Sequence, residues 1–96
     1  MIEVTGPLWL WDGAKGSWHF LTVPETEAAE LRLHRLAEHG SFGSIRVEAA
    51  LGDVRWRTSL FPVARTREFL LPVKADVRRR AHIAAGDQIT VVIEPI

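Results

Sequence analysis

The stretch FLLPVKADVRRRAHIAAGDQITVVIE, residues 69–94, contains the signals that decide the fold. It begins with apolar residues typical of a strand and reaches Pro72, after which a short basic segment has the composition of a helix. The dipeptide Gly86-Asp87 then predicts a turn, and the β-branched residues after it predict another strand. Such a unit occurs in small β-barrels and in some DNA-binding regulators, so the rest of the chain has to decide between them.

An earlier segment repeats this order of features. WHFLTVPETEAAEL, residues 18–31, resembles REFLLPVKADVRRR, residues 67–80, and each contains an aromatic residue, apolar residues, a proline and a helix-compatible stretch. Pro24 and Pro72 lie 48 positions apart, which is half of the 96-residue chain. Because similarity at a fixed period indicates a repeat, we predict two related halves, 1–48 and 49–96, within one domain.

A helix is predicted after each of the two prolines. The first spans about residues 25–39, where acidic residues in the opening turn suit the helix dipole. The second spans about residues 74–82 and offers Val73, Val77 and Ala81 at a spacing of four. Both helices are expected to cover a sheet. For the first helix we expect an apolar face of Ala29, Leu33, Leu36 and Ala37.

The hairpin after the first helix can be placed in register. Gly52-Asp53 is a two-residue turn with glycine first, which predicts type II′. One face is then apolar and the other polar, as a half-buried sheet requires. The apolar pairs are Leu51 with Val54, Ala49 with Trp56, Val47 with Thr58 and Ile45 with Leu60, and the polar pairs are Glu48 with Arg57 and Arg46 with Ser59.

These elements predict a mainly β fold. Strands are expected near 3–11, 17–23, 44–51, 54–61, 67–72 and 88–94. Closure of a small sheet removes exposed edges, so we predict a six-stranded, pseudo-duplicated closed barrel with two short helices over residues 1–96.

Three stretches in order along the chain resemble one known family. WLWDGAKGSWHFLTVP, GSFGSIRVEAALGDVRWRTSLFP and the stretch 69–94 together resemble the bacterial domain-of-unknown-function 1905 family. The resemblance implies a small β-barrel domain and brings no established activity or catalytic residues. The segment VARTR after Pro62 lacks the glycine expected at that turn. Residues 69–94 alone also resemble, more locally, the swapped-hairpin transcription factors.

The composition narrows the functional classes. With no cysteine, the chain cannot form disulfides or cysteine zinc sites, and a cytoplasmic location is the default expectation. The first residues, with Glu3 and Pro7, do not have the pattern of a signal peptide, so none is expected, and no apolar run approaches the roughly 18 residues of a membrane helix. The formal charge is zero, with an acidic first half and a basic second half. This neutrality disfavours a nucleic-acid binder, although Arg78, Arg79 and Arg80 are consecutive.

Two groups of residues are candidates for ligand binding. Trp9 and Trp11 share a parity on the first strand, so one surface of the sheet carries two indoles for stacking, unless they cover the core as Trp56 is expected to do. Trp18 and His19 must face opposite ways. The polar candidates are Arg46, Arg57 and Ser59 on the hairpin and Lys74 at the start of the second helix.

The sequence offers few candidate residues for catalysis or metal binding. Nothing in the spacing of His19, Ser59 and Asp87 indicates that they converge, and no metal site or cofactor is predicted. We therefore expect a non-catalytic binding module, monomer or homodimer, for a small anionic or aromatic ligand or for a protein partner. The alternatives are a dimeric DNA-binding regulator of swapped-hairpin type and a small hydrolase or isomerase that uses His19.

Overall fold

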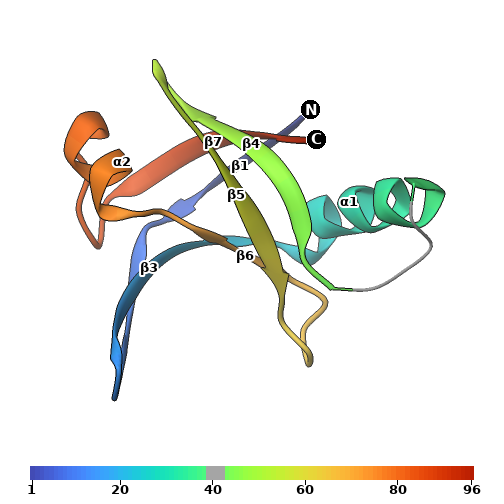
Figure 1. Cartoon of the computed structure of the whole chain (residues 1–96), viewed down its shortest axis with the longest axis horizontal. Helices are drawn as coiled ribbons and strands as arrows, with labels where there is room; N and C mark the ends of the chain where they lie inside the picture. Colours follow the sequence, from blue (N-terminus) through green and yellow to red (C-terminus); the bar gives the residue numbers. More distant parts are fainter. Residues whose placement is uncertain (39–42) are drawn as a thin grey trace.

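The computed structural model describes residues 1–38 and 43–96. Within these ranges the chain forms one antiparallel sheet in the order β1-β7-β4-β5-β6-β3-β2, and the predicted mainly β fold is confirmed. The elements are β1 (Ile2–Pro7), β2 (Trp9–Gly13), β3 (Gly16–Val23), α1 (Glu25–Glu38), β4 (Ile45–Leu51), β5 (Val54–Pro62), β6 (Phe69–Pro72), α2 (Ala75–Ala81) and β7 (Gln88–Pro95) (Figure 1).

The sheet curls into a half-barrel, and the prediction of six strands in a closed barrel is wrong. Among the described residues, β1 and β2 are the two edge strands of a seven-stranded sheet. The predicted strand 3–11 divides at Leu8, because β1 pairs with β7 whereas β2 pairs with β3. The Leu8 N–H donates to the carbonyl of Asp87 at 2.8 Å, and the Leu8 carbonyl accepts from the Gly86 N–H at 2.8 Å. Leu8 is thus the corner at which the chain changes partner strands.

The hairpin of β4 and β5 has the predicted register. Ala49 lies opposite Trp56 on the core face, and Glu48 lies opposite Arg57 on the outer face. Gly52 has a φ of 59°, and Asp53 is not among the residues of positive φ, as a type II′ turn requires. Trp56 is buried, and its indole N–H donates to the carbonyl of Pro72 at 3.3 Å. This indole therefore joins β5 to β6 inside the half-barrel.

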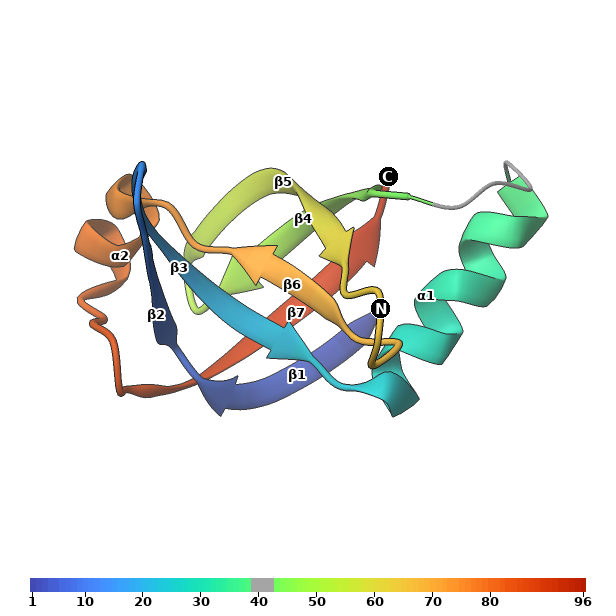
Figure 2. The ribbon, with the colours of Figure 1, turned by 90° about the horizontal axis from the view of Figure 1, so that it is seen from below.

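The two helices lie at opposite ends of the curled sheet (Figure 2). Helix α2 buries Val77, as predicted, and ends at His82 in the left-handed conformation. Helix α1 buries Ala28 and Leu31, whereas Ala29 is exposed and Leu33 is 69% exposed. The predicted apolar face of α1 is therefore wrong for these two residues, because the helix packs against the core through Ala28 and Leu31 instead. The side chains of Leu36 and Ala37, and residue His39, lie outside the described residues.

The turn between β5 and β6 compensates for its missing glycine. Arg67 adopts a φ of 63°, the left-handed region in which glycine is ordinarily preferred. The Val63 N–H donates to the carbonyl of Glu68 at 2.9 Å and closes the turn. Arg32 of α1 donates to the Arg67 carbonyl, so the helix and the turn support each other.

The two strand-proline-helix units are neighbours in space. Strand β3 pairs antiparallel with β6, with Leu21 opposite Leu71. Because the strands run in opposite directions, α1 and α2 leave the pair at opposite ends (Figure 2). The internal duplication stays a prediction. Neither helix in the described ranges is long and apolar enough to cross a membrane.

Candidate binding site: an aromatic cleft

The hairpin of β2 and β3 carries four aromatic side chains on its outer face. Across the hairpin, Trp9 lies opposite Phe20 and Trp11 lies opposite Trp18. Since side chains alternate along a strand, these four share one face. Leu10 and His19 lie opposite each other on the other face. The prediction that Trp18 and His19 face opposite ways is thus confirmed.

This aromatic surface continues across two more strands. Leu70 of β6 lies opposite both Thr22 of β3 and Phe61 of β5. Together the strands form a cleft of about 380 Å³. We call it the aromatic cleft, and the side chains that line it are Trp9, Trp11, Trp18, Phe20, Phe61 and Leu70.

Ring contacts hold the aromatic cleft in shape. Trp9 packs against Phe20 with centroids 5.3 Å apart and planes inclined by 45°. Trp18 is nearly parallel to Phe20, at 6.2 Å and 4°. The Trp9 indole N–H donates to the Thr22 hydroxyl at 2.9 Å, which fixes the ring orientation. The walls of the cleft are therefore organised without a ligand.

Gly13 makes room for the Trp11 indole. A Cβ added at Gly13 would lie only 2.1 Å from Cη2 of Trp11, so the ring lies directly over this glycine. Trp11 is nevertheless 49% exposed, and Trp18 is 53% exposed. Two half-exposed indoles side by side form an apolar patch of the kind that marks interaction surfaces on monomeric proteins.

The candidate residues from the sequence occupy three separate places. Trp9 and Trp11 line the aromatic cleft, and neither belongs to the core. The second place is the outer face of the β4–β5 hairpin, and the third is the exposed residue Lys74, the N-cap of α2. Lys74 is thus not part of the cleft lining. The hairpin group comprises Arg46, Glu48, Arg57 and Ser59.

The hairpin group is held by exposed polar contacts. Arg46 donates to the Ser59 hydroxyl at 3.4 Å, and Glu48 lies 4.0 Å from Arg57. Glu48 also lies 3.7 Å from Arg55, a partner that the sequence reading had not included. Surface ion pairs at such distances contribute at most about 1 kcal/mol each. Ser59 borders the aromatic cleft, because it lies two residues before Phe61 on the same face of β5.

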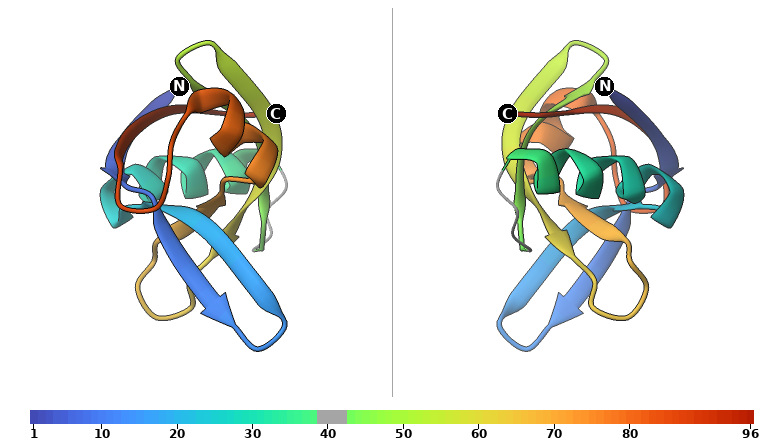
Figure 3. Two further views of the ribbon diagram at one scale, coloured as in Figure 1. Left: turned by 90° about the vertical axis from the view of Figure 1, so that its left-hand side faces the viewer. Right: turned by 90° about the vertical axis from the view of Figure 1, so that its right-hand side faces the viewer.

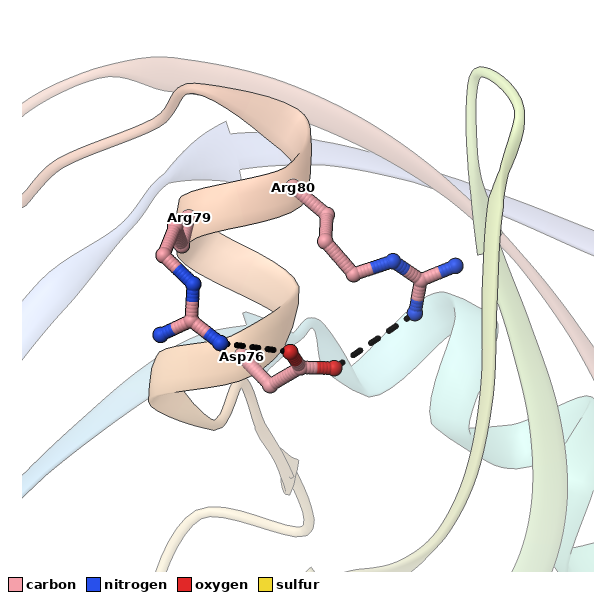
Figure 4. Close-up of polar contacts among 3 residues, drawn as sticks. All are labelled: Asp76, Arg79 and Arg80. Carbon is pink, nitrogen blue, oxygen red and sulfur yellow. Dashed lines mark hydrogen bonds and ion pairs between the residues drawn. The ribbon is translucent and has the colours of Figure 1, made fainter.

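The three consecutive arginines of α2 do not form one cationic stripe. Asp76 accepts from Arg79 at 2.7 Å and lies 3.5 Å from Arg80 (Figure 4). Arg78 instead donates to the carbonyl of Val73 at 2.6 Å. Part of the positive charge of α2 is therefore balanced within the helix, and its guanidinium groups diverge.

The residues considered for catalysis have separate partners. Ser59 is bonded to Arg46, and the Asp87 carboxylate accepts from the N–H of Ala84 at 2.8 Å. The pKa of His19 is lowered from its ordinary value by burial and, secondarily, by the Arg78 cation. No interaction joins these three residues in the described part of the chain. Residues 1–38 and 43–96 likewise contain no cluster of three histidine, aspartate or glutamate residues that could hold a metal ion.

Sequence reasoning missed four of the six residues in the lining: Trp18 as a member of the cleft, Phe20, Phe61 and Leu70. A signal for two of them was available, because Trp-x-Trp and Trp-x-Phe flank the short turn at Ala14-Lys15 and would pair in a hairpin. Phe61 and Leu70 meet only through the turn at residues 63–68, whose conformation depends on the unusual backbone of Arg67.

Comparison with known proteins identifies the family of the chain and does not identify a ligand. No curated protein matches the chain. The family described as "Domain of unknown function (DUF1905)" matches residues 5–93, which include every strand except the start of β1 and the end of β7. The chain therefore belongs to the DUF1905 family.

Proposed function

We propose that the chain is a non-catalytic binding module whose aromatic cleft holds a flat aromatic group of a small molecule or of a protein partner. One observation carries this proposal: three indoles and two phenyl rings line a single open cleft outside the core. Ligand sites are typically concave, mostly apolar and formed in advance. The ring contacts and the hydrogen bond from Trp9 meet the last condition.

The apolar lining favours aromatic ligands over sugars. A sugar ring brings hydroxyl groups that lose water on binding, and each hydroxyl left without a partner costs about 1–3 kcal/mol. The indole N–H of Trp9 is already bonded to Thr22, so the cleft has few groups to replace that water. A flat aromatic ring instead gains about 25 cal/mol for each Å² of apolar surface that it buries.

Charge at the border of the cleft favours an anionic over a cationic ligand. Ser59 lies two residues from Phe61, which is about 7 Å along an extended strand. The Arg46 guanidinium lies 3.4 Å from the Ser59 hydroxyl. An aromatic carboxylate with its ring in the cleft can therefore direct its charge toward Arg46. The proposal therefore keeps Arg46 and Ser59 as ligand contacts and gives less weight to Arg57 and Lys74.

Thermal unfolding tests the proposal with matched compounds. We expect 2-naphthoate to raise the melting temperature, cyclohexanecarboxylate to raise it less because it is not flat, and trimethylanilinium to raise it least because it is cationic. A ligand at about one hundred times its dissociation constant adds roughly 2.7 kcal/mol, which in a domain of this size corresponds to about 10 °C or more. If short duplex DNA alone raised the melting temperature, the DNA-binding alternative would replace this proposal.

Two alanine variants locate the binding. Trp18→Ala removes a wall of the aromatic cleft and is expected to abolish most of the shift with 2-naphthoate. Leu10→Ala is the matched control, since Leu10 is exposed to a similar degree on the other face of the same hairpin. Equal shifts in wild type and Trp18→Ala would place the ligand elsewhere and contradict the proposal.

A further inference from the structure

Strand β2 has a free edge. In the described sheet it is the last strand, and it pairs with β3 alone. The hairpin of β2 and β3 projects from the body of the half-barrel, visible as the blue extension in Figures 1 and 3. The other edge strand, β1, contacts β3 and helix α1 in addition to its partner strand β7.

The hydrogen bonds of Leu8 show which backbone groups point outward along this edge. Leu8 bonds through its N–H and its carbonyl to the segment at Gly86 and Asp87, on the side away from β3. Successive residues of a strand alternate in this respect, so Leu10 and Asp12 direct their N–H and carbonyl groups to the same side. In the described part of the chain, no backbone group pairs with Leu10 or Asp12 on that side.

Apart from the charge of Asp12, the edge of β2 has neither a proline, nor a lysine, nor a bulge. Natural sheets blunt their edges with proline, lysine, bulges or a covering loop. Strand β2 has the sequence WLWDG, with one charge at Asp12, and both Leu10 and Trp11 are close to half exposed. An open row of backbone groups accepts an extended polypeptide, since a small ligand cannot satisfy donors and acceptors along the strand.

From these observations we infer that β2 pairs with β2 of a second copy of the chain, antiparallel about a two-fold axis at Trp11. The inference stands independently of the proposed function. It extends the aromatic cleft, because Trp11 of the partner subunit joins the same face.

The register of β2 is self-complementary about this axis. The outward-pointing residues Leu10 and Asp12 are placed symmetrically on either side of Trp11. Leu10 of each copy therefore lies opposite Asp12 of the partner subunit, where two residues exchange both backbone hydrogen bonds. Trp9 lies opposite Gly13 of the partner subunit, and so meets the indole that covers this glycine. An interface formed by the same patch on both copies closes as a dimer.

A proline on the edge tests the pairing. We expect wild type and Asp12→Ala to approach twice the monomer mass of 10.8 kDa in sedimentation as the concentration rises from about 1 µM to about 500 µM. Asp12→Pro removes an outward N–H that makes no backbone bond to the described residues, and is expected to remain a folded monomer by circular dichroism. Wild type that remains monomeric, or Asp12→Pro that dimerises like Asp12→Ala, would overturn the inference.

Cysteine substitution tests the axis without relying on the proline variant. The chain contains no cysteine, so a single introduced thiol can pair only with the partner subunit. Directly opposite residues that do not exchange hydrogen bonds lie about 4.5 Å apart at Cα, which permits a disulfide. In a glutathione buffer, Trp11→Cys is expected to form a linked dimer and Lys15→Cys, at the turn, is not. Equal linkage of both variants would contradict the register.

The experiments distinguish failure of the proposed ligand function from failure of the proposed dimer. If Asp12→Pro is monomeric and 2-naphthoate still raises its melting temperature, the cleft binds ligand without the partner subunit and both proposals hold. If wild type dimerises and 2-naphthoate has no effect, only the proposed ligand function fails. If wild type remains monomeric and 2-naphthoate raises its melting temperature, only the dimer fails.

Discussion

The shape of the aromatic cleft depends on the absence of a side chain at Gly13, because the Trp11 indole lies over this residue. A methyl group at Gly13 would overlap the indole at 2.1 Å, and the ring would have to move. Gly13→Ala is therefore expected to displace Trp11 and to weaken binding of 2-naphthoate, while the rest of the sheet stays folded. Ser17→Ala is the control, because Ser17 pairs with Asp12 on the other face of the same hairpin. The measurement is the ligand-induced shift in melting temperature. Equal shifts in both variants would show that Trp11 has no fixed role.

His19 contributes a pH dependence of known sign. Its pKa is lowered in the folded protein by burial and by Arg78, so the unfolded state binds the proton more readily. Stability due to His19 is present above the ordinary pKa of 6.5 and is lost as the pH falls toward the lowered value. Urea unfolding at about pH 7.5 and about pH 5.5 is expected to show a larger loss in wild type than in His19→Gln. Identical losses of stability in wild type and His19→Gln would mean that groups other than His19 cause the pH dependence.

At the scale of elements, the features predicted correctly are those that depend on residues close together in the chain. The β4–β5 register follows from the Gly52-Asp53 turn and the alternation of apolar residues, and every predicted pair is present. The division of the first strand at Leu8 was not predictable in this way. It depends on the contact of Leu8 with Gly86 and Asp87, nearly the whole chain away. Only part of the aromatic cleft was predictable for the same reason, because Phe61 and Leu70 meet only after the turn at Arg67 has formed.

Helix α1 shows why periodicity alone did not select the buried face. Ala28 with Leu31 and Ala29 with Leu33 both repeat at helical spacing, so the sequence offers two adjacent apolar rows. In the structure the first row faces the core, and Arg32 of the same helix donates to the Arg67 carbonyl. Which row is buried depends on packing in the core cluster, which helical spacing alone does not show.

Two leucines of α1 distinguish the buried row from the exposed one. Leu31→Ala is expected to lower the free energy of unfolding by about 2–5 kcal/mol, as in other fully buried positions. Leu33→Ala is expected to change it by no more than about 0.5 kcal/mol, because Leu33 is 69% exposed. Urea unfolding gives both values. Comparable losses would mean that the second row is buried in solution.

At the scale of the whole molecule, the interior of the half-barrel is filled and the candidate site lies outside it. The core side chains from both halves of the sheet form one cluster, closed at opposite ends by α1 and α2 (Figure 2). The aromatic cleft instead uses the outer face of β2, β3, β5 and β6. A ligand there does not compete with the core, so variants of the cleft can lose binding and keep the fold.

The indole N–H resonances test the central claim most directly, because the protein has four tryptophans. Trp9, Trp11 and Trp18 line the aromatic cleft, whereas Trp56 is buried and bonded to Pro72. In a titration of the ¹⁵N-labelled protein with 2-naphthoate, we predict that the three cleft resonances shift together along one binding curve and that the Trp56 resonance stays in place. If the three cleft resonances did not respond, or if all four resonances shifted alike, the assignment of the aromatic cleft as a binding site would be contradicted.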